Sequence, residues 1–184
     1  MNIRGINGHK TSVLVLLSGG IDSTACVGYY ISQECNVSAL FVDYGQASVK
    51  HERKAASAVA DYFGIPLKQL NVSGCNINDG YIKARNAMLL STALMSFEHR
   101  SGIVALGIHS GTPYVDCSPD FKHLMQQIYD LYEDGRVRID APFLNWTKSE
   151  IWDYALTLNV PLELTYSNNL GSLSPIADHL RVRQ

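Results

Sequence analysis

Short runs of apolar residues alternate along this chain with segments in which apolar residues recur at helical spacing. A continuous apolar run without a polar face predicts a β-strand that is covered on both sides, as in a parallel sheet. Such runs predict five strands, over residues 13–17, 37–43, 65–72, 102–108 and 136–141. Helical spacing predicts five helices, over residues 22–33, 51–63, 86–100, 120–132 and 147–158. Thr147, with Glu150 three residues later, predicts a capping box at the start of the last helix.

This alternation predicts an α/β fold, with a single Rossmann-like parallel sheet of about five strands and helices on both faces. The chain has 184 residues, which is enough for one such domain with a core of its own. We therefore expect a single domain over residues 1–184, with an irregular C-terminal tail from about residue 160 to residue 184. Ligands of such sheets bind beyond the carboxyl ends of the strands. This rule gathers residues 18–24, 43–46, 85–86 and 109–121 at one edge of the predicted sheet.

The turn after the first predicted strand reads Ser-Gly-Gly-Ile-Asp-Ser-Thr over residues 18–24. Two glycines allow a tight turn and a close backbone approach, and Asp22, Ser23 and Thr24 are good capping residues for the helix that follows. The unpaired N–H groups at a helix N-terminus favour phosphate. The spacing differs from a Walker A loop and from Gly-x-Gly-x-x-Gly. The turn therefore predicts another kind of phosphate loop, and the plainer alternative is a strand-to-helix turn without a ligand.

Residues 18–23 resemble the Ser-Gly-Gly-x-Asp-Ser loop of the ATP pyrophosphatases, which split ATP into AMP and pyrophosphate while they adenylate a substrate. Further segments narrow this resemblance. They are Asp-Tyr-Gly-Gln at 43–46, Ala-Arg-Asn at 84–86, Tyr-Val-Asp-Cys-Ser-Pro-Asp-Phe at 114–121, Thr-Lys-Ser-Glu-Ile at 147–151 and Thr-Tyr-Ser at 165–167. In this order they make residues 12–168 similar to the 7-cyano-7-deazaguanine synthases, the QueC-like family of the queuosine pathway. The resemblance implies an adenine nucleotide alpha hydrolase-like fold.

The resemblance also implies a site for ATP with Mg²⁺. Asp22 would act through Mg²⁺ or through the shape of the loop, and Lys148 would neutralise the pyrophosphate leaving group. The alternatives are a helix-capping aspartate and a solvated lysine. The other implied nucleotide contacts are Ser18, Gly19, Gly20, Ser23 and Thr24 in the loop, Asp43, Tyr44 and Gln46 after the second strand, and Arg85 and Asn86 at a helix start. A helix cap is the alternative role for Asn86.

The implied substrate contacts are Asp116 and Phe121, in the segment 114–121. A carboxylate at Asp116 would accept hydrogen bonds from the adjacent N–H donors of a guanine-like edge, and the alternative is an aspartate that serves only the turn. Ser118 stands where the family usually has arginine. The family also carries four C-terminal zinc cysteines, but Asn168 follows Tyr-Ser here and residues 170–184 contain no cysteine. We therefore expect no zinc site.

Composition and charge exclude several other classes. A formal net charge of -2 gives no indication of a surface for polyanions, so we expect no nucleic-acid partner. No apolar run approaches the roughly 18 residues that a membrane span needs, so we expect no membrane partner. The four cysteines are Cys26, Cys35, Cys75 and Cys117, and none of them form a Cys-x2-Cys pair. Free thiols are typical of the reducing cytoplasm, where we expect the protein to work.

The resemblance implies a ligase that uses ATP to adenylate a carboxylate and joins it to nitrogen. The resemblance implies 7-carboxy-7-deazaguanine as the acid, ammonia as the acceptor and 7-cyano-7-deazaguanine as the product. One alternative is a diverged relative that activates a deazaguanine or another acid for a different acceptor, for example in an antiphage system. Others are a nucleotide-binding module without turnover and a tRNA sulfurtransferase, which would need a catalytic cysteine pair. A homodimer, or a partner protein that covers the tail, is a further expectation.

Overall fold

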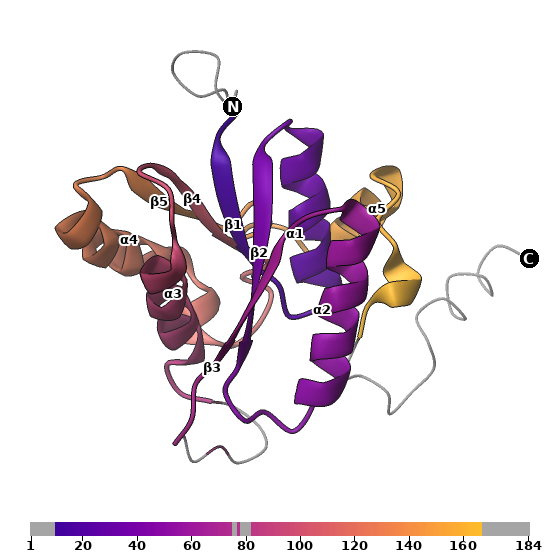
Figure 1. Cartoon of the computed structure of the whole chain (residues 1–184), viewed down its shortest axis with the longest axis horizontal. Coiled ribbons are helices and arrows are strands. Elements are labelled where there is room, and N and C mark those ends of the chain that lie inside the picture. Colours follow the sequence, from indigo (N-terminus) through magenta and orange to yellow (C-terminus); the bar gives the residue numbers. More distant parts are fainter. Residues whose placement is uncertain (1–9, 75–76, 78–81, 167–184) are drawn as a thin grey trace, which may run out of the picture.

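A parallel sheet of five strands forms the centre of the molecule, with the order β3-β2-β1-β4-β5 (Figure 1). The computed structural model describes residues 10–74, 77 and 82–166. The strands are β1 (Ser12–Leu16), β2 (Asn36–Asp43), β3 (Leu67–Asn71), β4 (Gly102–Leu106) and β5 (Val137–Asp140). The helices are α1 (Ile21–Ser32), α2 (Val49–Phe63), α3 (Arg85–Ser96), α4 (Pro119–Glu133) and α5 (Lys148–Thr157), with short 3-10 turns η1 (Val115–Cys117) and η2 (Leu162–Leu164). The predicted α/β fold is confirmed.

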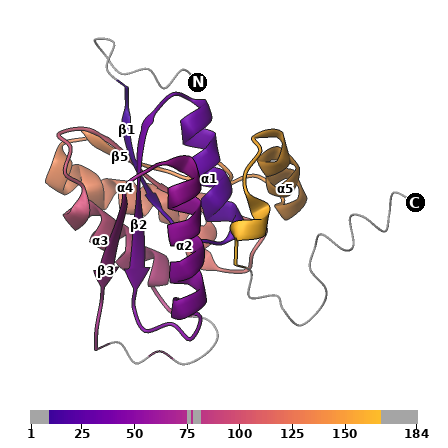
Figure 2. The same ribbon diagram turned by 45° about the vertical axis from the view of Figure 1, so that its right-hand side comes forward.

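The sheet separates two hydrophobic layers, because successive side chains of a strand point to opposite faces. Val13 and Val15 of β1 belong to the layer formed with α1, α2 and α5. Leu14 and Leu16 belong to the layer formed with α3 and α4. Figures 1 and 2 show these two groups of helices on opposite sides of the sheet. The four apolar side chains of β1 are all buried, which explains why residues 13–16 form an apolar run without alternation.

The third strand is shorter than predicted because the end of α2 occupies its first residues. Gly64 ends α2 in a left-handed conformation with φ 63, and the N–H of Ile65 donates to the Ala60 carbonyl at 3.0 Å. Pro66 has no N–H to donate to a neighbouring strand. β3 therefore begins only at Leu67.

The helix starts confirm one predicted cap and correct others. Thr147 and Glu150 form the predicted capping box, with Thr147 N donating to Glu150 Oε2 at 2.7 Å and Glu150 N donating to Thr147 Oγ1 at 3.3 Å. The capping role expected in the first loop is wrong, because α1 begins at Ile21 and Gly20 is its N-cap. The residues expected to cap it, Asp22, Ser23 and Thr24, lie inside the first turn.

Two further expectations concern the start of α3 and the C-terminal tail. Asn86 is not a cap, because Ala84 holds that position at the start of α3 with φ 60. The expected irregular tail begins near η2, and its residues 167–184 lie outside the described residues. No helix in the described ranges has the length and apolar character that crossing a membrane requires.

A glutamine side chain covers the outer edge of β5, which is an edge strand of the sheet. Gln126 of α4 donates from Nε2 to the Val137 carbonyl at 3.1 Å, and its Oε1 accepts from Ile139 N at 2.6 Å. Its amide thus pairs with the two backbone groups that a further strand would use. Exposed edges template association with other chains, so this contact protects the sheet as well as stabilising it.

Replacing Gln126 with alanine should lower the free energy of unfolding by about 1–2 kcal/mol, because two backbone groups at the edge of β5 lose their partners. Urea unfolding followed by circular dichroism measures this change. Gln69→Ala is the control, since Gln69 is an exposed glutamine on the opposite edge strand β3. Equal stability of the two variants would contradict the role assigned to the Gln126 amide.

Candidate functional site

The loop between β1 and α1 is pressed against α2 at a glycine. Gly19 has φ 79, a conformation that residues with a side chain rarely adopt. A Cβ at this position would lie 2.7 Å from Ala55 Cβ and 2.7 Å from Ala56 N. The sequence predicted a close backbone approach at the two glycines, and the structure shows that α2 is what Gly19 approaches.

A second glycine, at the end of β4, lets that strand touch the first turn of α1. A Cβ at Gly107 would lie 2.4 Å from the Asp22 carbonyl oxygen and 2.7 Å from Ser23 N. These are backbone atoms, so they cannot move aside without moving the helix. Reasoning from the sequence missed Gly107 as a site residue, because its contact is with a segment more than eighty residues away in the chain.

Hydroxyl groups hold the loop in shape from within. Ser18 Oγ accepts from Gly20 N at 3.3 Å and lies 3.2 Å from Ser23 Oγ. The Gly20 carbonyl accepts from Ser23 Oγ at 2.9 Å and from Thr24 Oγ1 at 2.8 Å. Thr24 is fully buried behind the loop, so in this arrangement its hydroxyl braces the turn. Its role as a phosphate contact stays a prediction.

The loop, the start of α5 and the end of the described chain enclose a cavity of about 210 Å³, which we call the loop cavity. Its lining consists of Ser18, Gly20, Ile21, Asp22, Ser23, Gly107, Lys148 and Tyr166. Lys148 Nζ lies 2.5 Å from Asp22 Oδ1 across it. The two residues predicted to be catalytic are therefore neighbours, although they lie at opposite ends of the domain sequence. The first turn of α1 adds a positive dipole end to the same cavity.

The last described residue closes this cavity from the side of α2. Tyr166 N donates to the Gly19 carbonyl at 2.9 Å, and its ring stacks on His51 with 5.2 Å between ring centroids. The chain thus returns to the glycine loop after η2. The resemblance included the segment 165–167, but the sequence offered no reason to place it against the loop.

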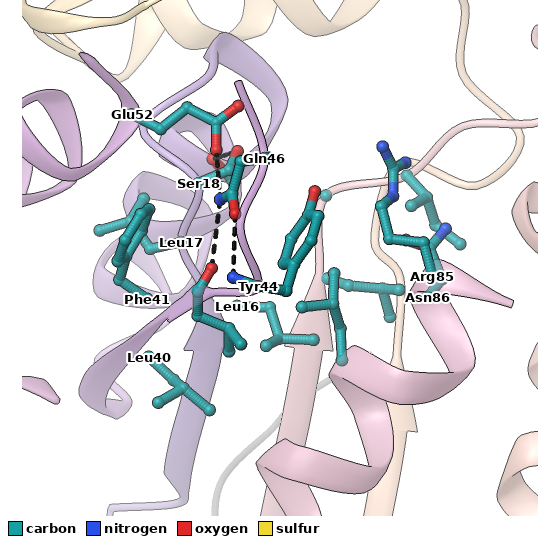
Figure 3. Close-up of a pocket in the computed structure, with 16 residues that line it drawn as sticks. Leu16, Leu17, Ser18, Leu40, Phe41, Tyr44, Gln46, Glu52, Arg85 and Asn86 are labelled. Atoms are coloured by element: carbon teal, nitrogen blue, oxygen red, sulfur yellow. Dashed lines mark hydrogen bonds between the residues drawn. The ribbon is translucent and has the colours of Figure 1, made fainter. Parts of the chain in front are cut away.

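A second cavity of about 200 Å³ adjoins the first at the carboxyl ends of β1, β2 and β4, and we call it the strand-end cavity (Figure 3). Ser18, Ser23 and Gly107 line both cavities. The other residues of its lining are Leu16, Leu17, Leu40, Phe41, Val42, Tyr44, Gln46, Glu52, Arg85, Asn86, Leu89, Leu106 and Ile108. An apolar floor with a few polar groups at the rim is typical of a small-molecule site.

Gln46 fixes one side of the strand-end cavity. Its Oε1 accepts from Tyr44 N at 2.9 Å, and its Nε2 donates to the Val42 carbonyl at 3.2 Å and to Glu52 Oε2 at 2.9 Å (Figure 3). Glu52 Oε1 accepts in turn from Ser48 Oγ at 2.6 Å. This buried amide ties the end of β2 to α2 and holds Tyr44 in place. Glu52 was not predicted as a site residue, since a glutamate on the first turn of a helix is common in any protein.

Tyr44 and Arg85 define the opposite, open side. Figure 3 shows the Tyr44 ring between Gln46 on one side and Arg85 with Asn86 on the other. Burial raises the pKa of the Tyr44 phenol, and the nearby Arg85 guanidinium opposes this rise by charge and by a hydrogen bond. The phenol is therefore neutral at physiological pH and available as a hydrogen-bond donor or acceptor.

Five of the predicted site residues lie outside the linings of both cavities, namely Gly19 and Thr24 of the loop and Asp43, Asp116 and Phe121. Asp43 ends β2, where its carboxylate accepts from Gly45 N at 3.0 Å and pairs with Arg53. Asp116 is buried in η1 and accepts from Asn86 N at 3.3 Å through Oδ2, which satisfies a free N–H at the start of α3. Phe121 packs on the layer formed with α3 and α4. Their roles as ligands stay predictions.

Asn86 joins the predicted substrate segment to the strand-end cavity. Its Nδ2 donates to the Asp116 carbonyl at 3.0 Å and lies 3.9 Å from Cys117 Sγ. Asn86 itself lines the strand-end cavity, so a displacement of η1 would shift the Asn86 side chain and change the shape of that cavity. Among the described residues, no group of three or more histidine, cysteine, aspartate or glutamate side chains could hold a metal ion.

The fold defines the class of protein. A solved structure described as a predicted subunit of tRNA methyltransferase, from Methanocaldococcus jannaschii, is similar with a TM-score of 0.57 and 16% sequence identity, over 79% of this chain and 74% of that one. A 4-thiouridine synthetase solved with RNA and bound ATP is similar with a TM-score of 0.52 and 18% identity, over 84% of this chain and 42% of that one. The protein has the adenine nucleotide alpha hydrolase-like fold, as the resemblance implied.

Sequence comparison identifies the family within this class. Residues 12–77 and 67–172 match the family model described as Queuosine biosynthesis protein QueC, and the chain belongs to that family. A 7-cyano-7-deazaguanine synthase of Prochlorococcus marinus (strain MIT 9515) is 29% identical, over 97% of this chain and 94% of the relative. One from Prochlorococcus marinus (strain NATL2A) is 30% identical, over 95% of this chain and 91% of the relative. The predicted family is thereby confirmed.

Replacing Gly107 with alanine should weaken binding of the predicted nucleotide at least tenfold, because the added methyl group displaces the first turn of α1. Titration calorimetry with ATP measures the affinity. Gly28→Ala is the matched control, because its added Cβ would meet the side chain of Val160 inside the core and would leave the loop untouched. Unchanged ATP affinity in folded Gly107→Ala would show that the contact between β4 and α1 does not shape the site.

Proposed function

We propose that this protein uses ATP to adenylate a carboxylic acid and then joins the activated acid to nitrogen, as a 7-cyano-7-deazaguanine synthase. The observation that carries the proposal is the pairing of Lys148 with Asp22 above the glycine loop, beside a cavity that opens at the strand ends. The loop cavity suits the phosphates of ATP, and the strand-end cavity suits a nucleoside. Membership of the QueC family supports the choice of reaction.

The loop cavity is proposed to hold the β- and γ-phosphates. The backbone N–H groups at the start of α1 and the hydroxyls of Ser18 and Ser23 line it. Gly20 lines this cavity without a side chain, so it would allow the phosphates to approach the main chain, while Gly19 would contribute through its backbone and lets the loop pack on α2. Such preorganised donors need no reorganisation when charge develops on the leaving group.

Lys148 is proposed to neutralise the pyrophosphate as it leaves. Its ammonium group belongs to the first residue of α5, is about half exposed and already points into the loop cavity. Pairing with Asp22 holds it there before ATP arrives. An incoming phosphate would compete for the same ammonium group, because it carries more negative charge than one carboxylate.

Asp22 is also the carboxylate that would hold Mg²⁺ together with phosphate oxygens. The chemistry of the donors fits, because Mg²⁺ takes few protein ligands when a nucleotide supplies the rest, and only one carboxylate lines the loop cavity among the described residues. When bound, the ion would offset negative charge on the phosphates. The protein's own part is to orient the nucleotide through the loop and through Lys148.

The strand-end cavity is proposed to take the nucleoside part of ATP. Tyr44 and Gln46 lie at the end of β2, and Arg85 and Asn86 lie at the start of α3, where they would contact the base, the ribose and the α-phosphate. A substrate carboxylate would attack the α-phosphorus, and pyrophosphate would leave toward Lys148. Ammonia would then displace AMP from the acyl-adenylate to give the amide. A second ATP would adenylate the amide oxygen, with loss of pyrophosphate, and AMP would leave with that oxygen as the nitrile forms. Asp116 and Phe121 are the proposed contacts of the acid.

Among its partners we propose a small-molecule acid and a second copy of the chain, and no nucleic acid. We also propose that the protein works in the cytoplasm, where ATP and reduced thiols are available. A tRNA sulfurtransferase is disfavoured by the cysteines. Cys26 is fully buried and its pKa is raised by burial, so it is a poor thiolate nucleophile. Cys26 packs in the layer of α1, while Cys117 contacts Asn86 beyond the opposite face of the sheet.

An assay of pyrophosphate release from ATP should show release that depends on 7-carboxy-7-deazaguanine, with nitrile formed when ammonium is supplied. Coupled spectrophotometry measures the release and mass spectrometry identifies the product. Release with a different acid or acceptor would point to the diverged relative. ATP binding without release under any of these conditions would leave only the nucleotide-binding module.

Lys148→Ala should lower the rate of pyrophosphate release by about 100-fold, because the leaving group loses its cation, while Lys148→Arg should retain part of the activity. Steady-state kinetics with saturating acid measure the effect. Lys68→Ala is the control, since Lys68 forms an exposed pair with Glu98 at a distant edge of the sheet. A loss of less than threefold in Lys148→Ala would contradict the role of this lysine.

A further inference from the structure

The peptide unit between Gly19 and Gly20 connects the loop cavity to the chain that follows η2. On one side of this unit, the Gly19 carbonyl accepts from Tyr166 N at 2.9 Å. On the other side, Gly20 N donates to Ser18 Oγ at 3.3 Å, and Ser18 and Gly20 both line the loop cavity. The C=O and N–H of a planar trans peptide point in opposite directions. The hydrogen bond from Tyr166 N therefore also fixes the direction of the Gly20 N–H.

This peptide unit can turn over at little cost, because glycine stands on both sides of it. Turning it over would take φ of Gly20 from -78 to positive values, which glycine adopts readily. The next carbonyl does not have this freedom. Gly20 O accepts from Ser23 Oγ at 2.9 Å, from Thr24 Oγ1 at 2.8 Å and from Thr24 N at 3.0 Å. The peptide unit between Gly19 and Gly20 is thus the part of the loop whose direction depends on its contact with Tyr166.

The two orientations of this unit offer opposite charge to an anion. In the orientation that the structure shows, Gly20 N–H is a donor at the cavity, and its bond to Ser18 is long enough to yield to a phosphate oxygen. In the opposite orientation the Gly19 carbonyl oxygen would point toward that side and would repel phosphate. The apparent affinity for phosphate falls by the fraction of molecules that are in the competent orientation.

We propose that Tyr166 is a positioning residue, which holds the peptide unit between Gly19 and Gly20 in the orientation that binds the β- and γ-phosphates of ATP. This role rests on the phosphate site proposed above, and it explains how that site is kept ready before ATP arrives. The N–H of Tyr166 acts through the Gly19 carbonyl. No contact between the tyrosine ring and a phosphate is required.

The ring of Tyr166 keeps this N–H in its place on α2. It stacks on His51, with 5.2 Å between ring centroids and an angle of 13° between the ring planes. His51 lies in the first turn of α2, and Gly19 approaches the same helix at Ala55 and Ala56. One helix therefore supports both partners of the hydrogen bond. Loss of the ring would leave the N–H in the chain but would no longer fix its position.

The chain that leads to Tyr166 is also anchored. Val160 is buried, and Leu162 and Leu164 pack on the layer formed with α1, α2 and α5. Thr165 ends η2, where its N donates to the Leu162 carbonyl at 3.1 Å and its Oγ1 donates to the same carbonyl at 2.7 Å. Figure 2 shows this part of the chain, in yellow, beside α2. The donor thus belongs to a segment that packing already holds against the loop.

Calorimetric titration of the full-length protein with inorganic pyrophosphate tests this role. An ester in place of the amide between Thr165 and Tyr166, introduced with the α-hydroxy acid of tyrosine, removes the N–H and keeps both side chains. It should weaken binding of pyrophosphate about tenfold, because the Gly19 carbonyl loses its donor. Tyr166→Ala should weaken binding about threefold, because the N–H remains without the ring stack. Tyr166→Phe should recover most of the affinity that Tyr166→Ala loses.

Tyr62→Ala is the matched control. Tyr62 also joins α2 to the chain after α5, since its hydroxyl donates to the Asn159 carbonyl at 3.2 Å, but it lies outside the linings of both cavities. This variant should bind pyrophosphate like the wild type. An ester protein that binds pyrophosphate as tightly as the wild type would overturn the role of Tyr166.

Titration with AMP separates an effect on the phosphate site from a general loss of structure. AMP has no β- or γ-phosphate, so its affinity should change by less than about twofold in the ester protein and in Tyr166→Ala, while the affinity for ATP should fall with that for pyrophosphate. Equal losses for AMP and pyrophosphate would show that these changes only loosen the fold, and would overturn the proposal.

These binding measurements are independent of turnover. If pyrophosphate binding depends on Tyr166 but no acid causes release of pyrophosphate from ATP, the positioning role stands and the ligase proposal fails. If acid-dependent release occurs and the ester protein keeps its affinity for pyrophosphate, the ligase proposal stands and the positioning role fails. A wild-type protein that binds neither ATP nor pyrophosphate would overturn both.

Discussion

Close approach of three backbone segments around the end of β1 is the constraint on which the site depends. Gly19 lets the loop touch α2, and Gly107 lets the end of β4 touch the first turn of α1. A methyl group at either position would meet main-chain atoms, which a packed interior cannot absorb by moving one side chain. With both glycines in place, the N–H groups of α1 open into the cavity that Lys148 and Tyr166 complete.

The charged groups around the loop determine which ligands this geometry can bind. The pair between Lys148 and Asp22 is partly exposed, and such pairs contribute about 0–1 kcal/mol to stability. Its position above a helix N-terminus is therefore better explained by anion binding than by folding. The buried amide of Gln46 has the complementary task, since it holds the end of β2 and Tyr44 in one arrangement. The side proposed for the nucleoside and the side proposed for the phosphates thus adjoin at Ser18 and Ser23, which line both cavities.

The elements were predictable from the sequence where one physical rule dominates. Apolar runs gave the strands, because both faces of this sheet are covered, and the capping box at Thr147 follows from side-chain chemistry within one turn. The start of α1 was mispredicted because the sequence alone does not distinguish a serine or threonine that caps a helix from a serine or threonine within its first turn. Asp116 was expected to face a substrate, yet its carboxylate meets the start of α3, a contact between segments thirty residues apart. Local patterns carry no information on such distant partners.

The sequence by itself determined the alternating α/β order, the glycine loop at the first helix and the family to which the chain belongs. Each of these features depends on residues that are close together along the chain. Only the tertiary structure decided that Lys148 stands over Asp22, that Gly107 makes room for α1 and that Tyr166 closes the loop cavity. These facts depend on how the helices pack on the two faces of the sheet, and packing joins residues that no local pattern connects.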